Sequence, residues 1–540
     1  MAGFSDPPIA IPPEAPNYHG CAEAKYYTQY LEDYIDRHVY ADKPLRSRFR
    51  FQYRVDNVEK TDDGWSVHAT YAHNEQRVFQ TSRLAVASGL TSIPNIPSFL
   101  SGKHDFQGPV LHHKGFATFS KSSLKSSECE NVAVIGGGKS SADMIWECLK
   151  KGKHVSWIIR EDGDGPALFI PAAAGGRYIN SMEKGACRLG ALFSSSAFMP
   201  NIWLAKFVQK TQFGMTQLRK KIQAIDQHCR NVAGYQDREG ALPHFKDLEP
   251  APSHSTFWHT GPLGMAQHHD FWPTIAQNVD VHRASITSLQ SHSLTLSNGA
   301  TVDAGALLLG TGWKSHQPFF SPSLAASLGL PHFARTDTPE DAKLWTSLLA
   351  AADKRVLSNM PVLAHPPPHK KADGEEMTTL RLYNAIAPLS TISDRSIVFL
   401  GRAHTSNSFR AAEAQAIWST AYLSGHLDGK LPALEEARRR TAYMNQASRR
   451  RYPTRGREGD CFVFEIVSYT DRLVEEVGLR SHRRCQGWWG CWTRAWWRGW
   501  VDDWLEPTMN GDFRGMVEEY RRLYGIGDGV EGGEGKAKRE

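Results

Sequence analysis

The sequence predicts an α/β protein with a parallel sheet covered by helices, followed by a helical C-terminal extension. Three observations lead to this fold class. Residues 131–160 read as a strand, a glycine-rich turn, an amphipathic helix and a second strand. Residues 292–313 read as a hairpin that leads into a short buried strand. After about residue 430, arginine-rich and tryptophan-rich segments with helical spacing follow.

The segment 131–160, NVAVIGGGKSSADMIWECLKKGKHVSWIIR, is typical of a βαβ unit that grips a dinucleotide. Gly136 allows the tight turn, and Gly138 lets the backbone approach a pyrophosphate that faces the N-terminus of the helix. Ser141 replaces the third glycine of the usual pattern. The apolar residues of the helix have the spacing that packs one face on a sheet: Ala142, Ile145, Trp146 and Leu149.

The second strand of this unit ends in Arg160, where an NAD-preferring site carries an acidic residue. A guanidinium there suits a 2′-phosphate, which predicts NADPH as the coenzyme. The alternative is a solvated arginine at a strand end. Lys139 either adds charge near the phosphates or is a solvated loop lysine. The predicted cofactor-binding residues of the unit are Gly136, Gly138, Lys139, Ser140, Ser141 and Arg160.

The composition indicates a multi-domain globular enzyme. The chain has 540 residues, 41% hydrophobic and 22% charged, with a net charge of +6 that implies no nucleic-acid partner. Its eight cysteines lack CxxC or zinc spacing, so we expect free thiols, no metal and a cytoplasmic location. The N-terminus does not have the pattern of a signal peptide. The pair His268-His269 indicates a surface turn rather than a metal site.

Three further motifs flank the βαβ unit. Residues 84–97, LAVASGLTSIPNIP, read as a strand with a proline-rich exit. Residues 106–116, FQGPVLHHKGF, follow the frame F-x-G-x-x-x-H-x-x-x-F with Phe106, Gly108, His112 and Phe116. Residues 292–313 place Asn298-Gly299 at a hairpin turn, then a buried strand 306–309 that ends in GTGW.

With these motifs in this order, residues 4–430 resemble the flavin-containing monooxygenases. The frame 106–116 is similar to the identifying motif of that family, and Phe116 at its last position separates it from the related Baeyer–Villiger enzymes. Segments 84–97 and 310–313 resemble the two crossovers between the family's domains. Residues 396–418 resemble its late FAD-domain strand and helix, in the positions Gly401, Glu413, Gln415 and Trp418.

The resemblance implies two Rossmann-like, three-layer dinucleotide-binding domains, with the NADPH domain inserted into the FAD domain. The expected organisation is a first FAD-domain part, an NADPH domain, a second FAD-domain part with the substrate region, a helical extension and a disordered tail. The corresponding ranges are 1–118, 119–312, 313–430, 431–525 and 526–540.

The activity implied by the resemblance is an FAD- and NADPH-dependent monooxygenase that transfers one oxygen atom from O₂ to a small organic substrate. A role in secondary-metabolite biosynthesis rests on family analogy. Such chemistry needs no nucleophilic side chain, and we assign no catalytic residue. We expect His112 to be a structural histidine rather than an acid–base group. The resemblance adds further cofactor-binding residues: Thr311, Gly312, Gly401 and Gln415.

One departure from the family concerns FAD. Family members begin with an FAD-binding βαβ unit that has its own G-x-G-x-x-G, whereas this sequence opens with GFSDPP, which resembles a segment further downstream. The alternative hypothesis is therefore a truncated, non-catalytic homologue that binds NADPH and has a regulatory function or none. A flavin-free NADPH reductase is a weaker third hypothesis.

The region after residue 430 leaves two alternatives open. Residues 438–457 contain eight arginines and no acid, which favours a solvated helix face docked on the FAD domain over a phosphate or nucleic-acid patch. In residues 488–504, tryptophans recur at every fourth position from Trp488 to Trp504. We favour a helix packed on the protein itself over a membrane-surface anchor, because Asp502 and Asp503 disfavour anionic lipid. The oligomeric state is not assigned.

Overall fold

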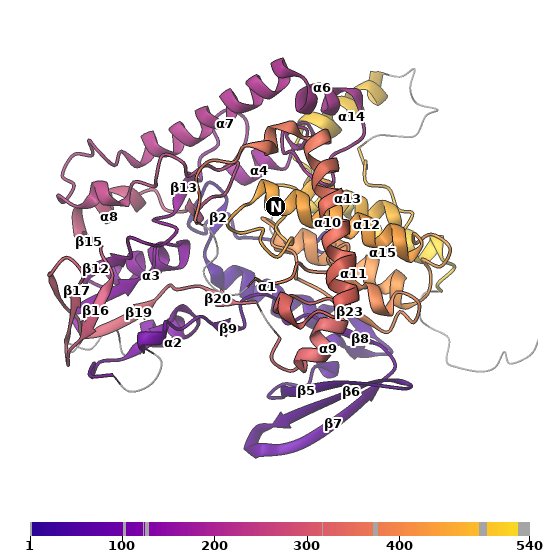
Figure 1. Ribbon diagram of the computed structural model, residues 1–540, viewed down its shortest axis with the longest axis horizontal. Helices are drawn as coiled ribbons and strands as arrows, with labels where there is room; N and C mark the ends of the chain where they lie inside the picture. The colour runs from indigo at the N-terminus through magenta and orange to yellow at the C-terminus, as the bar shows by residue number, and fades with distance from the viewer. Residues whose placement is uncertain are drawn as a thin grey trace, which may run out of the picture.

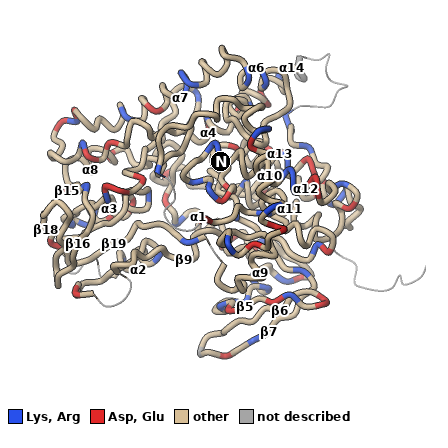
Figure 2. The backbone as a smooth tube through the Cα atoms, viewed as in Figure 1, with Lys and Arg blue, Asp and Glu red and all other residues tan. Residues whose placement is uncertain are grey.

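The computed structural model of the chain describes residues 3–100, 104–122, 124, 129–315, 317–370, 376–484 and 494–527. The predicted α/β class with a helical C-terminal region is confirmed. Figure 1 shows a half built on a parallel sheet on the left and a helix-rich half on the right. In Figure 2, basic and acidic residues are interspersed over both halves.

The sheet of the first half has five parallel strands in the order β10-β19-β11-β12-β15. Ile135 at the end of β11 lies between Leu309 of β19 and Ile158 of β12. The two predicted strands and the buried strand 306–309 are therefore neighbours in one sheet. Their bounds are β10 Val110–His112, β11 Asn131–Ile135, β12 His154–Ile159, β15 Val279–Arg283 and β19 Ala306–Leu309.

Alternate side chains of these strands enter two different cores. Val132 and Val134 pack with helices on one face, whereas Ala133 packs on the other face against an antiparallel sheet. The covering layers are therefore helices on one side and strands on the other. The helices are α2 His113–Lys121, α3 Lys139–Lys150 and α8 Phe271–Asn278, and the covering strands are β16 Ile286–Leu289, β17 Ser293–Leu296 and β18 Thr301–Asp303.

The predicted hairpin turn is confirmed. Strands β17 and β18 are antiparallel, and Asn298-Gly299 lies between them with Gly299 at a φ of 83°. The side chain of Asn298 accepts a hydrogen bond from the backbone N–H of Ala300 (3.1 Å). This turn closes the sheet that covers the Ala133 face.

The second half contains a parallel pair, β8 (Leu84–Val86) with β23 (Ile397–Phe399), beside helix α11 (Ser408–Leu423). Strand β9 (Ile93–Pro94) pairs with β20 (Trp313–Lys314), so the two crossover segments between the halves lie side by side. The other strands here are β5 Arg54–Thr61, β6 Gly64–Tyr71, β7 Glu75–Thr81, β21 Leu382–Tyr383 and β22 Ala387–Pro388.

Long helices complete this half and share its largest core with β8 and β23. Helix α10 packs against α12, and α11 packs against α13. Their bounds are α10 Pro339–Asn359, α12 Leu434–Arg451, α13 Ile466–Glu476, α14 Arg494–Leu505 and α15 Met516–Leu523.

Shorter elements connect these parts. The strands are β1 Asn17–Tyr18, β2 Cys21–Ala22, β3 Val39–Tyr40, β4 Lys43–Pro44, β13 Leu168–Pro171 and β14 Leu263–Ala266. The helices are α1 Ala24–Arg37, α4 Ser181–Gly185, α5 Arg188–Ala191, α6 Trp203–Lys210, α7 Gln212–Ala233 and α9 Pro322–Ser327. No helix among the described residues combines the length and apolar character needed to span a membrane.

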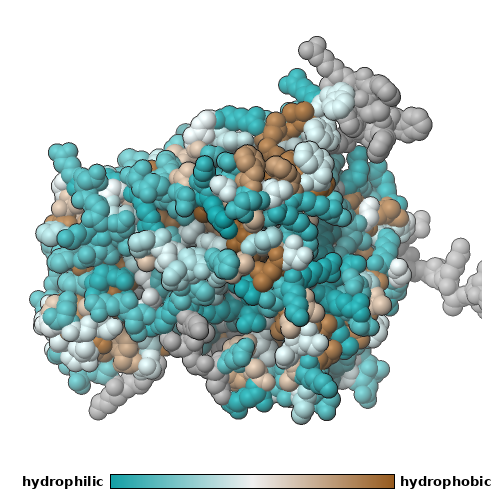
Figure 3. All heavy atoms as spheres, turned by 45° about the horizontal axis from the view of Figure 1, so that its top comes forward, coloured by the Kyte–Doolittle hydropathy of each residue, from teal (hydrophilic) through white to brown (hydrophobic). Residues whose placement is uncertain are grey.

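The tryptophan-rich helix is described from Arg494 onward, as α14. The predicted helix over residues 485–493 lies outside the described residues. The same holds for the predicted tail from residue 528. Asp503 points inward and pairs with Arg188 (3.0 Å), whereas the side chains of Trp497 and Trp500 are 57% and 43% exposed. On the face in Figure 3, hydrophobic residues form separate patches, one of them near α6 and α14.

Candidate functional site

The glycine-rich turn after β11 has one closed side and one open side. Gly136 has a φ of 120°, and a Cβ there would lie 2.5 Å from the backbone oxygen of Gly310. By contrast, no atom lies within 4 Å of the place that a Cβ of Gly138 would take. Helix α3 begins directly after Gly138, so its free N–H groups face this open side. The turn thus fits a pyrophosphate.

The other residues of the turn divide between packing and solvent. Ser141 is fully buried, and a Cβ on Gly310 would lie 1.9 Å from its Oγ, so its side chain packs α3 onto the end of β19. Lys139 pairs with Asp143 and donates to Gln267 Oε1 (3.1 Å). Ser140 is half-buried.

Arg160 follows the last residue of β12, and its side chain is 64% exposed. Its Nε lies 3.8 Å from Asp162 Oδ1, a distance at which an exposed ion pair is weak. The guanidinium is therefore accessible at the strand end, where a ribose phosphate would approach. This position fits the coenzyme phosphate that the sequence predicts.

His112 joins strand β10 to the second crossover and caps the start of α2. Its Nε2 lies 2.9 Å from the backbone oxygen of Gly312, and its Nδ1 accepts the N–H of Lys114 (3.2 Å) at the start of α2. This pattern requires the proton on Nε2. Burial lowers the pKa of His112, so the ring is neutral at pH 7. These contacts support the structural role that the sequence favours.

The remaining residues of the frame 106–116 are packing residues. Phe106 lies in the core between the two sheets, and Phe116 lies in the core under the helices. A Cβ on Gly108 would lie 2.3 Å from the backbone oxygen of Gly305, so the chain passes close to the start of β19 there. Residues 106–116 thus belong to the packing of the five-stranded sheet.

Thr311 and Gly312 lie in the second crossover. The hydroxyl of Thr311 donates to the backbone oxygen of Asn95 (2.6 Å), and the N–H of Asn95 donates to the oxygen of Gly312 (3.0 Å). Gly312 has a φ of 83°, a conformation that glycine adopts without strain. Both residues therefore join the crossovers at the carboxyl end of β19.

Gly401 marks the end of β23. Its φ is 71°, its N–H donates to Gln415 Oε1 (2.9 Å), and a Cβ there would lie 3.8 Å from the Cα of Gly89. Gln415 is fully buried and also donates to the hydroxyl of Tyr469 (2.9 Å). Gln415 thus holds the turn at Gly401 from within α11.

A cluster of charged residues that the sequence did not reveal follows this turn. We name Arg402, His404, Glu458 and Asp460 the polar core. Arg402 Nη2 lies 3.5 Å from Glu458 Oε2, and His404 Nε2 lies 3.8 Å from Asp460 Oδ2. The backbone N–H of His404 donates to the oxygen of Asp460 (2.9 Å), which brings the two segments together.

The polar core holds buried atoms that lack a hydrogen-bond partner. Within the described part of the chain, these include Arg402 Nε and Asp460 Oδ2. Burial raises the pKa of Asp460 to about 6, against the opposing charge of Arg402. The protein that surrounds most of its ring, then the charges of Arg455 and Arg402, lowers the pKa of His404 to about 4, although its side chain is 45% exposed. Unpaired buried polar groups are costly and mark sites that meet a ligand, a proton or water.

Two further buried histidines lie in the segment between α7 and β14. His254 and His259 carry ring nitrogens without partners among the described residues. Burial lowers the pKa of both, and the charge of Arg455 acts in the same direction on both rings. The charge of His404 also lowers the pKa of His259, so these two rings interact electrostatically.

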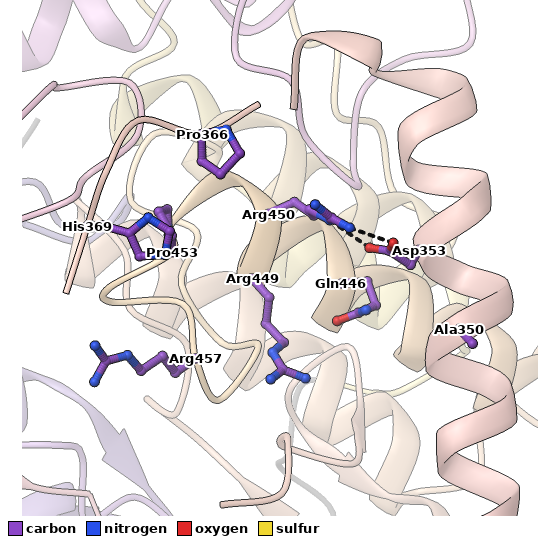
Figure 4. Close-up of a pocket in the computed structure, with 9 residues that line it drawn as sticks. All are labelled: Ala350, Asp353, Pro366, His369, Gln446, Arg449, Arg450, Pro453 and Arg457. Atoms are coloured by element: carbon purple, nitrogen blue, oxygen red, sulfur yellow. Dashed lines mark hydrogen bonds and ion pairs between the residues drawn. The ribbon is translucent and has the colours of Figure 1, made fainter. Parts of the chain in front are cut away.

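The arginine-rich stretch 438–457 is mostly paired or buried. Arg440 bonds Glu436 on the outer face of α12, and Arg450 makes two bonds to Asp353. Arg449 and Arg457 line a pocket of about 460 Å³. Figure 4 shows their guanidinium groups extending in different directions, so they do not converge on one anion. Helix α12 docks on the core through Ala437, Ala442 and Met444, in line with the interpretation that the sequence favours.

The parallel pair β8–β23 provides a partial fit for a flavin. Gly89 and Gly401 approach each other at the carboxyl ends of the two strands, and Arg402 and His404 follow. A second glycine-rich turn between a strand and a helix, of the kind that holds the FAD pyrophosphate, is not among the residues that the structure describes. The described residues thus offer an open turn for a dinucleotide and only part of a flavin site.

Comparison with known proteins identifies the family. A family model described as L-lysine 6-monooxygenase/L-ornithine 5-monooxygenase matches residues 23–167. An FAD-dependent monooxygenase of Pyrenophora dematioidea is 32% identical over 477 residues, which cover 84% of this chain and 83% of that protein. Another, of Aspergillus nomiae, is 30% identical and covers 83% of this chain and 76% of that protein.

Among solved structures, the open crystal structure of cyclohexanone monooxygenase is similar to 85% of this chain and 83% of that chain, with 15% identity and a TM-score of 0.49. The sequence relatives decide the assignment, because they are similar over most of both chains. The chain belongs to the FAD-dependent monooxygenases, a family of flavoprotein oxidoreductases.

Proposed function

We propose that this protein is an FAD- and NADPH-dependent monooxygenase that transfers one oxygen atom from O₂ to a small organic substrate. The observation that carries this proposal is the turn at Gly136–Gly138, open on the side of the helix N-terminus and flanked by the accessible Arg160, in a member of this family. When bound, NADPH would supply two electrons, and FAD would transfer them to O₂.

The proposed coenzyme contacts come from one edge of the five-stranded sheet. Gly138 and the first N–H groups of α3 bind the pyrophosphate, and Arg160 binds the 2′-phosphate. Lys139, already paired with Asp143, adds positive charge to the same edge. His112 holds the second crossover and Asn95 joins the two crossovers, so that the coenzyme domain, inserted between the two parts of the FAD domain, keeps its orientation.

On the flavin side, we propose that Gly401 and Gln415 shape the turn that approaches the ring, and that the polar core borders the reaction space. Arg402 is almost fully buried, which supports a water-poor environment there. A role in secondary-metabolite biosynthesis is supported by the fungal sources of the relatives. A cytoplasmic location is supported by free thiols at the six cysteines that the structure describes.

The deciding experiment is the visible absorption spectrum of the full chain after incubation with FAD. Flavin bands that stay with the protein through a desalting column, and that bleach when NADPH is added without oxygen, are the expected result. A colourless protein that still binds NADPH would contradict the proposal. That result would favour a non-catalytic NADPH-binding homologue, the alternative motivated by the absence of a second glycine-rich turn from the described residues.

A further inference from the structure

The polar core lies at the edge of the sheet where ligands are expected. Strands β8 and β23 are parallel, and Arg402 and His404 follow β23 after the turn at Gly401. In open α/β sheets, ligands bind outside the carboxyl ends of parallel strands. Residues 402–404 are therefore placed next to whatever binds at this edge.

Asp460 is a buried acid with an unused oxygen. The residue is 1% exposed, and its Oδ2 has no hydrogen-bond partner in the described part of the chain. Glu465, five residues further on, is equally buried, but its oxygens accept from the hydroxyls of Tyr452 (2.6 Å) and Ser194 (3.1 Å). Unlike Glu465, Asp460 thus has an oxygen that no structural hydrogen bond occupies, and this oxygen is available to take up or release a proton.

His404 connects Asp460 to solvent. Its side chain is 45% exposed, whereas that of Asp460 is 2% exposed, and 3.8 Å separates Nε2 from Oδ2. A small rotation of the ring, or one water molecule, closes this gap. A proton held by the buried carboxyl can therefore pass to His404, which follows β23 at the edge where a ligand is expected.

The charges around the pair suit proton transfer. The positive charges of Arg455 and Arg402 disfavour the protonated ring of His404, whereas the negative charge of Glu458 favours it. The pKa values of the buried His254 and His259 are also lowered. A neutral ring beside a carboxyl that titrates near pH 6 passes a proton without trapping it.

We propose that His404 and Asp460 form a proton relay that delivers the proton consumed by oxygen activation; this rests on the proposed monooxygenase function. The balanced reaction is S + O₂ + NADPH + H⁺ → SO + H₂O + NADP⁺. The O–O bond breaks, one oxygen bonds to the substrate, and the other leaves as water. The hydride of NADPH and the relayed proton supply the two hydrogens of that water.

The test uses FAD-loaded protein without substrate, which also consumes the proton: NADPH + H⁺ + O₂ → NADP⁺ + H₂O₂. The rate of NADPH oxidation is measured between about pH 5 and about pH 9 for Asp460→Asn, His404→Ala and the matched buried acid Glu465→Gln. In the wild type, the rate should fall as the pH rises through about 6, where Asp460 loses its proton. Asp460→Asn should lose this inflection and drop by about a hundredfold, whereas Glu465→Gln should keep it.

His404→Ala separates a relay from a structural contact. Its rate should fall by a similar factor and rise again when imidazole is added, because the free base can replace the missing ring. An unchanged pH profile in Asp460→Asn, or a failure of imidazole to restore His404→Ala, would overturn the relay.

A second measurement needs no flavin. The melting temperature of Asp460→Asn minus that of the wild type should increase as the pH rises from about 4 to about 7, because the wild type must then bury a charge. A flat difference excludes a titrating Asp460 and with it the relay. If the protein retains no flavin and oxidises no NADPH, the proposed function fails, while a rising difference still shows that Asp460 exchanges its proton.

Discussion

His112 and Arg160 show how the surroundings of one side chain separate a structural role from a binding role. Both ring nitrogens of His112 are engaged with backbone groups, and the side chain is buried. The guanidinium of Arg160 is exposed and held by one long ion pair. A group with all its polar atoms engaged holds the fold, whereas an accessible charge at a strand end is free to meet a ligand.

Arg160→Asp should weaken NADPH binding by about 10- to 100-fold, because it removes charge-assisted hydrogen bonds worth roughly 1.5–3 kcal/mol each and repels the phosphate. NADH should bind as well as before or better. Fluorescence titration with both coenzymes measures this. Arg54→Asp, a change of an exposed strand arginine far from the turn, is the control. Equal NADPH affinity in wild type and Arg160→Asp would show that Arg160 does not contact the phosphate.

His112→Ala should lower the stability by about 1–3 kcal/mol, because the oxygen of Gly312 and the first turn of α2 lose their partner. The measurement is the melting temperature. His228→Ala, on the exposed face of α7, should leave it unchanged. A variant of normal stability that has lost only NADPH oxidation would instead identify His112 as an acid–base group.

His254 gives a pH dependence with a definite sign. Burial, then the charge of Arg230, lowers its pKa to about 4, so the folded protein holds the ring neutral. The unfolded chain binds a proton below about pH 6.5, and the stability contributed above that pH is lost as the pH falls to about 4. The loss amounts to about 3 kcal/mol. Denaturant titrations at several pH values should show a shallower acid-side loss for His254→Gln, and parallel curves would contradict this.

At the scale of elements, the strand–turn–helix unit was predictable because its determinants are local. The glycines, the helix spacing and the flanking strands of residues 131–160 lie within one segment, and so do Asn298-Gly299 and its two strands. The polar core was not predictable, since residues 402–404 and 458–460 are far apart in the sequence and meet only in the folded chain, through backbone and side-chain contacts. No spacing in the sequence signals a pair that tertiary contacts create.

Two glycines of one turn should respond oppositely to the same change. Gly136→Ala places a methyl 2.5 Å from a backbone oxygen at a φ of 120°, and should cost about 2 kcal/mol or more of stability. Gly138→Ala meets open space at a φ of −95°, so the fold should be kept. Its methyl occupies the approach of the pyrophosphate, and NADPH affinity should fall roughly tenfold. Melting temperatures and coenzyme titrations distinguish the two; similar behaviour of both variants would contradict the open-side geometry.

At the scale of the whole molecule, the reaction space is assembled from parts that are distant in the sequence. The ends of β11, β19 and β23 all carry glycine turns, at Gly136, Gly310 and Gly401. The paired crossovers β9 and β20 connect the two halves.

The contact between Ser141 and Gly310 constrains how this protein can change over time. A serine at 141 is compatible with a residue at 310 that has no side chain, because the hydroxyl fills the place of the missing Cβ. A larger residue at 310 needs both a different side chain at 141 and a shift of the backbone of α3, because a Cβ at 310 would also lie 2.9 Å from the backbone nitrogen of Ser141. Libraries that randomise the coenzyme turn for altered specificity should therefore vary these two positions together.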